Sequence, residues 1–227
     1  MNYVFPPAPP VAVQVLGGDA VFPVRRVYCV GQNYADHVAE MGNDGREPPV
    51  FFSKPADALV PGGGDIALPP MTENYHHEVE LVIAIGLGGQ DIPVDQALEH
   101  VFGYAVGFDL TRRDLQAQAK KKGQPWETGK GADQSAPISA IRPVAQGPHP
   151  DHGAIWLKVN GEGRQQGDLS QMIWSAAEII ANLSGYFRLA PGDLIFTGTP
   201  AGVSALKRGD VVEGGIDGIG ELKARIE

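Results

Sequence analysis

Three acidic residues lie at the ends of apolar segments, where an isolated carboxylate is costly to bury. Glu78 and Glu80 are two residues apart at the start of the apolar run 81–85, and Asp109 follows the apolar run 101–108. Residues two apart on a strand point to the same face, and two buried carboxylates must share a proton or bind a cation. Three carboxylates suit a hard cation such as Mg²⁺ or Mn²⁺. An equally weighted alternative places the pair in solvent, on the polar face of an edge strand.

A histidine and a glutamate form a second candidate pair. His37 and Glu40 are three residues apart in a segment with helical character, so their side chains can touch. A carboxylate that holds an imidazole makes a general base able to deprotonate water near neutral pH. The alternative is an exposed helical pair without a chemical role, and the spacing alone favours it. His76 and His77 add little, because adjacent residues of a strand point to opposite faces.

Polar residues that could receive an anionic substrate follow Asp109 on an expected helix. Arg113, Gln116 and Lys120 are spaced i, i+3 and i+7. Arg113 and Gln116 belong to the turns nearest the possible cation, so they could reach a substrate carboxylate or a developing oxyanion. Residues 120–122 are all lysine, and they are expected to form a solvated helix end, where positive charge suits the helix dipole.

Three further sites carry reactive or polar groups. Lys130 lies between Gly129 and Gly131, a flexible presentation that is unusual for a purely structural lysine. Residues 197–200 (TGTP) follow an apolar strand, and their hydroxyls and amides could bind a carboxylate or could form an ordinary exit turn. Cys29 is the only cysteine; it follows a tyrosine in an apolar segment and is expected to be buried and inert.

Short elements separated by turns must position these residues. Glycine and proline account for 30 and 19 of the 227 residues, which favours many turns over long helices. Strands are expected at 11–15, 22–24, 26–31, around 51–54, at 78–85, 101–108, 154–159, 194–197 and in a final pair that ends at 226. Helices are expected at 33–41, at 111–122 with Thr111 as N-cap, and at 170–187. The pattern predicts a mainly β fold with flanking helices, and it argues against a parallel, doubly wound sheet.

The composition bounds the class of protein. A length of 227 residues suits one large domain. A net charge of −9 gives no general attraction for nucleic acid, and an anionic substrate would need local positive charge at its site. No apolar run is long enough to span a bilayer, so no membrane association is expected. The N-terminus lacks an export signal, which makes the cytoplasm the expected location.

The order of motifs from Val27 to the C-terminus resembles the fumarylacetoacetate hydrolase family over roughly 200 residues. The resemblance is specific because the motifs follow one another at matching spacing, whereas each alone would be weak. The matching stretches are VYCVGQNYADHVAEMG, FFSKP, NYHHEVELVIAIG, GYAVGFDLTRRDLQ, KKKGQPWETGK, WLKVNGEGRQ and LIFTGTPAGV.

The resemblance implies a cation site and a base. Glu78, Glu80 and Asp109 would hold one divalent cation per subunit, Mg²⁺ or Mn²⁺. His37 and Glu40 would activate water, on a short helix that orders as a lid over the substrate.

The same resemblance implies the residues around the substrate. Lys130 and Gln116 would face the reacting carbonyl together with Arg113, and Thr199 would bind a substrate carboxylate. Lys54 is similar to a lysine near the site of the family and is expected to bind substrate.

The implied fold is a mixed β-sandwich roll, and the implied assembly is a homodimer. Residues 1–24 would form an N-terminal arm and hairpin, with the arm packed on the body or on a second subunit. Residues 25–227 would form a single catalytic domain.

The implied activity is metal-dependent hydrolysis of a carbon–carbon bond in a small anionic keto acid, an acylpyruvate. The expected substrate is fumarylpyruvate, cleaved to fumarate and pyruvate in the gentisate pathway of aromatic catabolism. Alternatives on the same site are a general acylpyruvase and an oxaloacetate decarboxylase, and a remote alternative is a β-rich binding protein without catalysis. Gln32 departs from the family, which commonly has arginine there, and this weakens any carboxylate-binding role of the position.

Overall fold

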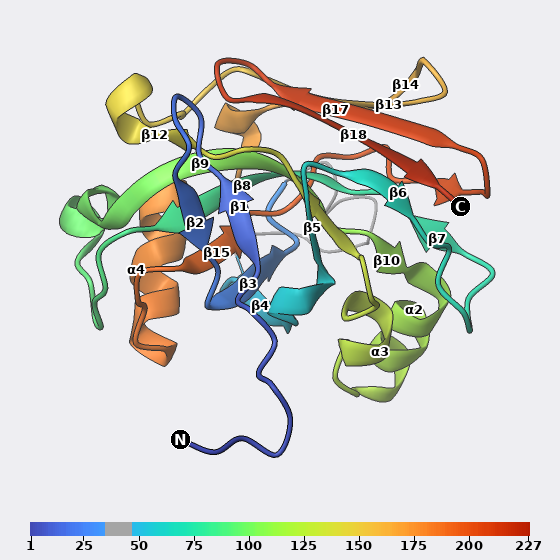
Figure 1. Cartoon of the computed structure of the whole chain (residues 1–227). Helices are drawn as coiled ribbons and strands as arrows, with labels where there is room; N and C mark the ends of the chain where they lie inside the picture. Colours follow the sequence, from blue (N-terminus) through green and yellow to red (C-terminus); the bar gives the residue numbers. More distant parts are fainter. Residues whose placement is uncertain (35–46) are drawn as a thin grey trace.

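The structure is a computed structural model that describes residues 1–34 and 47–227 (Figure 1). In this part of the chain the larger sheet contains β3 (Arg26–Gly31), β4 (Val50–Lys54), β5 (Leu59–Pro61), β8 (Val79–Ile85), β9 (Val101–Phe108), β11 (Ala136–Ile138), β12 (Arg142–Pro143) and β15 (Asp193–Phe196). A smaller sheet contains β6 (Gly64–Ile66), β13 (Ala154–Val159), β14 (Glu162–Asp168), β17 (Val211–Ile216) and β18 (Gly220–Ile226). Minor sheets pair β1 (Ala12–Gln14) with β2 (Val21–Pro23), and β7 (Tyr75–His76) with β10 (Thr111–Arg112) and β16 (Ala205–Leu206). The helices are α2 (Arg113–Lys122), α3 (Glu127–Lys130) and α4 (Ala176–Tyr186), with 3₁₀ segments η1 (Ala56–Ala58), η2 (Val94–His100), η3 (Val144–Gln146) and η4 (Leu169–Gln171).

Two mixed sheets form the body of the protein. The larger sheet has the order β4-β3-β15-β8-β9-β11-β5, with β12 paired to β9, and the smaller has the order β14-β13-β17-β18-β6. Each combines parallel and antiparallel pairs: β15 runs parallel to β3, and β18 runs parallel to β6. Figure 1 shows the smaller sheet along one side of the larger one, with α2, α3 and α4 at the periphery. The expected mainly β fold with flanking helices is confirmed.

Strand β8 lies at the centre of the larger sheet, and all seven of its residues are buried. Its alternating side chains contribute to two separate cores. Leu81 and Ile83 belong to the core that also contains Leu157 of the smaller sheet, whereas Val82 and Ala84 belong to the core beneath the β1–β2 hairpin. Burial of each large aliphatic side chain stabilises the fold by about 1.5–3 kcal/mol. The backbone at the start of β8 is therefore fixed by the packing on both faces of the strand.

The helix expected at 170–187 begins later than the apolar pattern indicated. The structure has the short segment η4 first, and α4 starts at Ala176. Ser175 is the N-cap: its hydroxyl accepts from the Glu178 N–H, and the Glu178 carboxylate accepts from the Ser175 N–H in return. This capping box satisfies two N–H groups that would otherwise lack partners, and it decides the boundary. In the described part of the chain no helix, α4 included, is long and apolar enough to cross a membrane.

The prediction that Thr111 is the N-cap of the helix after Asp109 was wrong. Thr111 belongs to β10, and its hydroxyl donates to the Asp109 carbonyl at 3.0 Å. Arg112 occupies the N-cap position of α2 without a side-chain cap. Asp114 instead accepts from the Thr72 hydroxyl at 2.6 Å, so a contact from another segment replaces the local capping box. The expected end of the helix is confirmed, because Gly123 adopts a left-handed conformation with φ 63°.

The β13–β14 hairpin matters because β14 carries a residue that reaches the site. The expected turn is confirmed: Asn160 and Gly161 have φ values of 54° and 81°. Two consecutive left-handed residues are what a type I′ turn requires, and Asn-Gly meets this requirement at little cost. Among the described strands, β14 stands at the end of the smaller sheet, next to β13.

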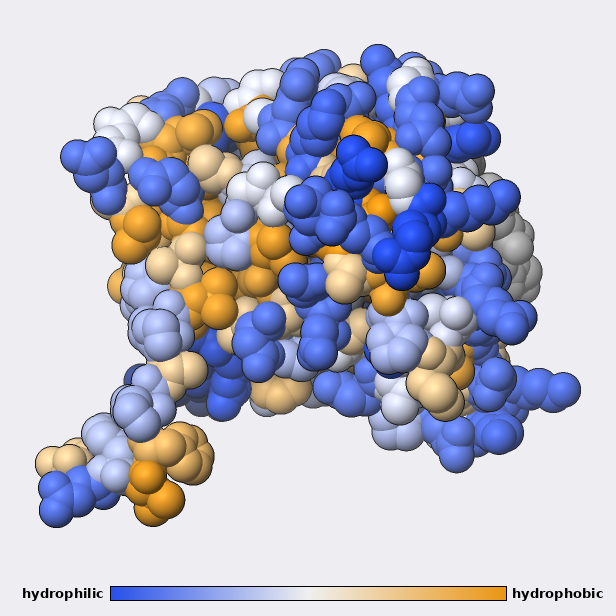
Figure 2. Space-filling view, turned by 45° about the vertical axis from the view of Figure 1, so that its right-hand side comes forward, coloured by the Kyte–Doolittle hydropathy of each residue, from blue (hydrophilic) through white to orange (hydrophobic). Residues whose placement is uncertain are grey.

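The N-terminal arm projects from the body (Figures 1 and 2). Val13 pairs with Phe22 in the expected hairpin, and both of these side chains are buried. Tyr3, Val4 and Phe5 before it are 64%, 99% and 76% exposed, so the body does not cover the arm.

Cys29 is buried, as expected, and burial raises the pKa of its thiol well above the ordinary value, with Asp109 adding to the effect. Because the thiolate is the reactive form, we expect no detectable reaction of the native protein with a thiol reagent such as DTNB at pH 8. One thiol per chain should react in guanidinium chloride. Rapid reaction of the native protein would contradict the buried position.

Candidate active site

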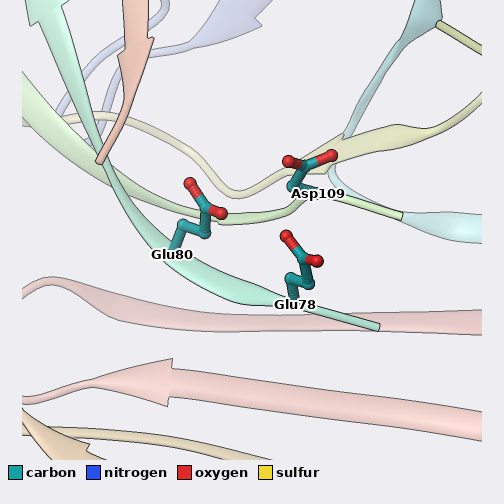
Figure 3. Close-up of side chains that lie close together, drawn as sticks. All are labelled: Glu78, Glu80 and Asp109. Atoms are coloured by element: carbon teal, nitrogen blue, oxygen red, sulfur yellow. The ribbon is translucent and has the colours of Figure 1, made fainter. Parts of the chain in front are cut away.

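Glu78, Glu80 and Asp109 converge where β8 begins and β9 ends (Figure 3). Their potential ligand oxygens all lie within 4.8 Å of one another, and all three residues are buried. The antiparallel pairing explains this convergence, since Glu80 lies opposite Gly107 and the Asp109 N–H donates to the Glu78 carbonyl at 2.8 Å. The structure thus brings the three predicted carboxylates together. The alternative of a solvated edge strand is wrong, because β8 lies between β15 and β9.

Lys130 and Arg113 approach these carboxylates from α3 and α2. The Lys130 Nζ lies 2.8 Å from Glu78 Oε2 and 2.6 Å from Asp109 Oδ2. Arg113 forms an ion pair with the other oxygen of Glu78, and it also donates to the Gln116 side-chain carbonyl. Burial alone would lower the pKa of Lys130, but Asp109 and Glu78 outweigh burial and raise this pKa above its ordinary value. Lys130 is therefore a buried ammonium that bridges two carboxylates.

Lys54 is buried against Asp109 and is not among the residues that line the cavity. Its Nζ donates to the Leu110 carbonyl at 3.1 Å, to the Ser135 hydroxyl at 2.9 Å and to the Lys130 carbonyl. It also lies 2.9 Å from Asp109 Oδ1. This set of partners orients Asp109 and the end of α3, and it leaves the ammonium no free direction towards a substrate.

Burial is costly for the Glu80 carboxylate. Burial raises its pKa well above the ordinary value, and the charges of Asp109 and Glu78 raise it further. Lys130 and a hydrogen bond of 2.8 Å from the Gly198 N–H to Glu80 Oε2 act in the opposite direction. Further positive charge beside Glu80 would favour its ionised form.

The residues present fit a divalent cation. The donor set consists only of carboxylate oxygens, which Mg²⁺ and Mn²⁺ prefer. The Lys130 ammonium already occupies a position between Glu78 and Asp109, which shows that a cation is electrostatically favoured there. Bound divalent charge would offset the repulsion that raises the pKa of Glu80.

A cavity opens beside these groups, with about 360 Å³ of empty space including its mouth. Its wall includes the predicted residues Glu78, Glu80, Arg113, Gln116, Lys130 and Thr199. The mixture of carboxylates with an ammonium and a guanidinium suits a small anionic molecule that also contacts a cation.

Two expectations about lysines need correction. Lys120 does not belong only to a solvated helix end, because it lines the cavity and its Nζ lies 5.8 Å from the centre of the Trp126 ring. Lys130 is not flexibly presented, because it is buried at the end of α3. Gly129 is needed for packing instead: a Cβ there would lie 2.9 Å from the Gln116 backbone nitrogen, so glycine lets α3 approach α2 closely.

His37 and Glu40 lie outside the described residues, as does most of the helix expected at 33–41. Asn33, just before them, is buried. Its side-chain amide donates to the carbonyls of Trp174 and Thr197 at 3.0 and 2.8 Å.

Several residues at or behind the cavity wall were not among the predicted site residues. Gln32 and Trp126 line the cavity, and Gln32 adopts a left-handed conformation with φ 62° that is uncommon for a residue other than glycine. His77 and Gln165 are buried and hydrogen-bonded to each other at 2.9 Å, behind the cavity wall. A polar residue at an inward position of β14 was the available signal for Gln165.

Comparison with known proteins shows similarity along nearly the whole chain. Residues 26–227 match the family described as fumarylacetoacetate (FAA) hydrolase C-terminal. The crystal structure of fumarylpyruvate hydrolase from Pseudomonas aeruginosa, in complex with Mn²⁺ and pyruvate, is 56% identical with a TM-score of 0.97, and the match covers 99% of each chain. The fumarylpyruvate hydrolase of Ralstonia sp is 47% identical over 79% of this chain and 93% of its own length. The mitochondrial oxaloacetate tautomerase FAHD1 of Rattus norvegicus is 45% identical over 89% of this chain and 92% of its own length.

Proposed function

The chain belongs to the fumarylacetoacetate hydrolase family, and from this premise we propose that it hydrolyses fumarylpyruvate to fumarate and pyruvate. The observation that carries the proposal is a cluster of three carboxylates with Lys130 and Arg113 beside one cavity. The similar enzyme from Pseudomonas aeruginosa, 56% identical, binds Mn²⁺ and pyruvate. Pyruvate is one of the two expected products.

An anionic substrate of an acidic protein needs local positive charge, and this cavity supplies it. The protein has a net charge of −9 and would repel a dianion at long range. Arg113 lines the cavity and can receive the pyruvate carboxylate through its planar donors. Lys130 and Gln116 lie beside it and can donate to the carbonyl oxygen on which negative charge develops.

A divalent cation would be held by Glu78, Glu80 and Asp109. When bound, it supplies Lewis-acid polarisation of the substrate's oxygens. Lys54, through its contact with Asp109, holds that carboxylate in place.

The proposed bond cleavage uses water as the second substrate. His37, oriented by Glu40, takes a proton from water, and the hydroxide adds to the carbonyl carbon of the fumaryl group. The bond from this carbon to the methylene carbon then breaks. Its electron pair leaves with the pyruvate portion as an enolate, which is protonated to pyruvate, and the fumaryl carbon becomes the carboxylate of fumarate.

Direct assay tests the proposal. Fumarylpyruvate, acetylpyruvate and oxaloacetate are compared at equal concentration with Mn²⁺ and with Mg²⁺, and pyruvate is measured with lactate dehydrogenase and NADH. We expect the highest kcat/KM for fumarylpyruvate, and loss of activity on chelation that is restored by the metal. Faster release of pyruvate from acetylpyruvate would indicate a general acylpyruvase, and faster release from oxaloacetate would indicate a decarboxylase.

Oxaloacetate tautomerisation is a second candidate, favoured by the 45% identity to the tautomerase FAHD1. It moves one proton between carbon and oxygen and needs no water, so enol loss would occur without release of pyruvate. Following the ultraviolet absorbance of enol-oxaloacetate beside the pyruvate assay separates the two activities.

We predict that His37→Ala lowers kcat by at least about 100-fold while KM changes little, as for the loss of a general base. The reason is that the proposed base acts on water and contributes little to substrate binding. His152→Ala is the matched control, because His152 is exposed and does not line the cavity. A rise in KM at unchanged kcat would assign His37 to binding instead.

The remaining expectations stay predictions. A homodimer is tested by light scattering coupled to gel filtration, and the preferred cation by metal analysis of the protein as purified. A place in gentisate breakdown follows from the resemblance, and location in the cytoplasm stays a separate prediction.

A further inference from the structure

Gln165 is a buried polar residue on a strand whose other residues are mostly exposed. It lies on β14 of the smaller sheet and is 2% exposed, whereas its neighbours Arg164 and Gln166 are exposed. It is not among the residues that line the cavity. A buried amide is costly unless its hydrogen-bonding groups are satisfied, so its partners show what it does.

All four hydrogen-bonding positions of the Gln165 amide are used. Its oxygen accepts from the Val79 N–H at 3.1 Å and contacts His77 Nδ1 at 2.9 Å. Its nitrogen donates to the Thr199 hydroxyl at 2.7 Å and to the Pro200 carbonyl at 2.8 Å. One side chain from the smaller sheet therefore joins the start of β8 to the segment that follows β15.

Two backbone partners define the orientation of the amide. The Val79 N–H can only donate and the Pro200 carbonyl can only accept, so oxygen and nitrogen cannot be exchanged. His77 Nδ1 must then carry a hydrogen. Thr199 Oγ1 receives the Gln165 N–H and directs its own hydrogen to the Val79 carbonyl, 2.8 Å away.

The residues that this amide joins lie next to the proposed cation ligands. Val79 stands between Glu78 and Glu80, and Thr199 follows Gly198, whose N–H donates to Glu80 Oε2. Gly198 and Thr199 both line the cavity. Gln165 thus adds to the bonds that join this wall to the strand of the carboxylates, although it does not line the cavity.

We infer that Gln165 is a positioning residue that sets the Gly198–Thr199 wall against the carboxylate cluster, and so controls both cation affinity and substrate orientation. This inference takes its substrate, fumarylpyruvate, from the proposed function, and it deepens that proposal. Groups behind the direct ligands typically change metal affinity or activity by about 10–100-fold when they are removed.

The test is a double-mutant cycle of Gln165→Met and Thr199→Val, two substitutions of similar shape. Each variant is measured for kcat/KM with fumarylpyruvate, for Mn²⁺ affinity by calorimetry and for thermal unfolding. We expect Gln165→Met to lower kcat/KM by about 10–100-fold and to weaken Mn²⁺ binding. The double variant should lose at least about threefold less in kcat/KM than the product of the two single losses, because the residues act through one contact.

Ser184→Ala is the control for a merely structural effect. Ser184 is buried in α4, accepts from the Ile92 N–H at 2.8 Å and does not line the cavity. Its loss should lower the unfolding temperature while kcat/KM and Mn²⁺ affinity stay unchanged.

The inference is overturned if the losses in the cycle multiply, or if Gln165→Met lowers only the unfolding temperature, as Ser184→Ala does. If Gln165→Met yields no soluble protein, Gln165→Asn, which keeps the amide one methylene shorter, enters the same cycle. If the wild type does not hydrolyse fumarylpyruvate, the proposed function fails by itself. In that case Mn²⁺ affinity, and pyruvate affinity in the presence of Mn²⁺, are measured for the four proteins of the cycle. Neither measurement needs turnover.

Discussion

Glu80→Gln is expected to abolish Mn²⁺ binding at micromolar metal and to lower turnover by about 10³-fold or more, while the protein stays folded. A metal that polarises a carbonyl contributes several kcal/mol to catalysis, and each 1.36 kcal/mol is about tenfold in rate. Glutamine has the shape of glutamate and can still accept the Gly198 N–H. Because burial already disfavours the charged form of Glu80, the metal-free variant should be at least as stable as the wild type.

Thermal unfolding with and without Mn²⁺ provides the measurement. A ligand at 100 times its Kd stabilises the folded state by about 2.7 kcal/mol, so the wild type should show a clear rise in unfolding temperature and Glu80→Gln should not. Glu213→Gln is the matched control, because Glu213 lies in the smaller sheet and pairs with Lys223 at the surface. Near-normal turnover of Glu80→Gln at limiting Mn²⁺ would show that the cation site is misassigned.

Lys130→Met is expected to lower kcat/KM by roughly 10³–10⁴-fold, through both kcat and KM. Removing one donor to a developing oxyanion costs about 10²–10³-fold in kcat, and loss of the positive charge also weakens attraction for a dianion. In the metal-free protein the same change leaves Glu78 and Asp109 without the ammonium that bridges them. Removing one partner of a buried ion pair typically destabilises a protein by about 3–5 kcal/mol.

The two effects of Lys130→Met can be separated by metal. Mn²⁺ should recover much of the lost stability, because it supplies positive charge to the same carboxylates, but it should not recover turnover. Mn²⁺ affinity should be equal to or higher than that of the wild type, since Lys130 no longer competes for Glu78 and Asp109. Lys121→Met, an exposed change on α2, should alter none of these quantities. Weaker Mn²⁺ binding by Lys130→Met would contradict this account of the charges.

The sequence was sufficient where a feature depends on neighbours in the chain. The alternation of apolar residues in 81–85 predicted a buried strand, and the spacing of Glu78 and Glu80 predicted carboxylates on one face, because a strand alternates its side chains. The Asn160–Gly161 hairpin and the end of α2 at Gly123 were also predictable, since each depends on a left-handed backbone that few residues adopt. The start of α4 was missed although its signal, Ser175 followed by Glu178, is local.

Tertiary structure alone decided whether the carboxylates are buried together and which charges meet them. Whether β8 is an edge or a central strand depends on the pairing of β15 with β8, and these strands are more than 100 residues apart in the chain. The bridge from Lys130 to Glu78 and Asp109, and the burial of Lys54 behind Asp109, likewise need α3 and β4 to be brought to the end of β9. Gln165 shows the same limit, because its four partners come from two segments that both lie far from it in the chain. The pattern of side chains along one strand follows from the periodicity of its backbone. Contacts between residues distant in sequence are decided only by how the two sheets pack.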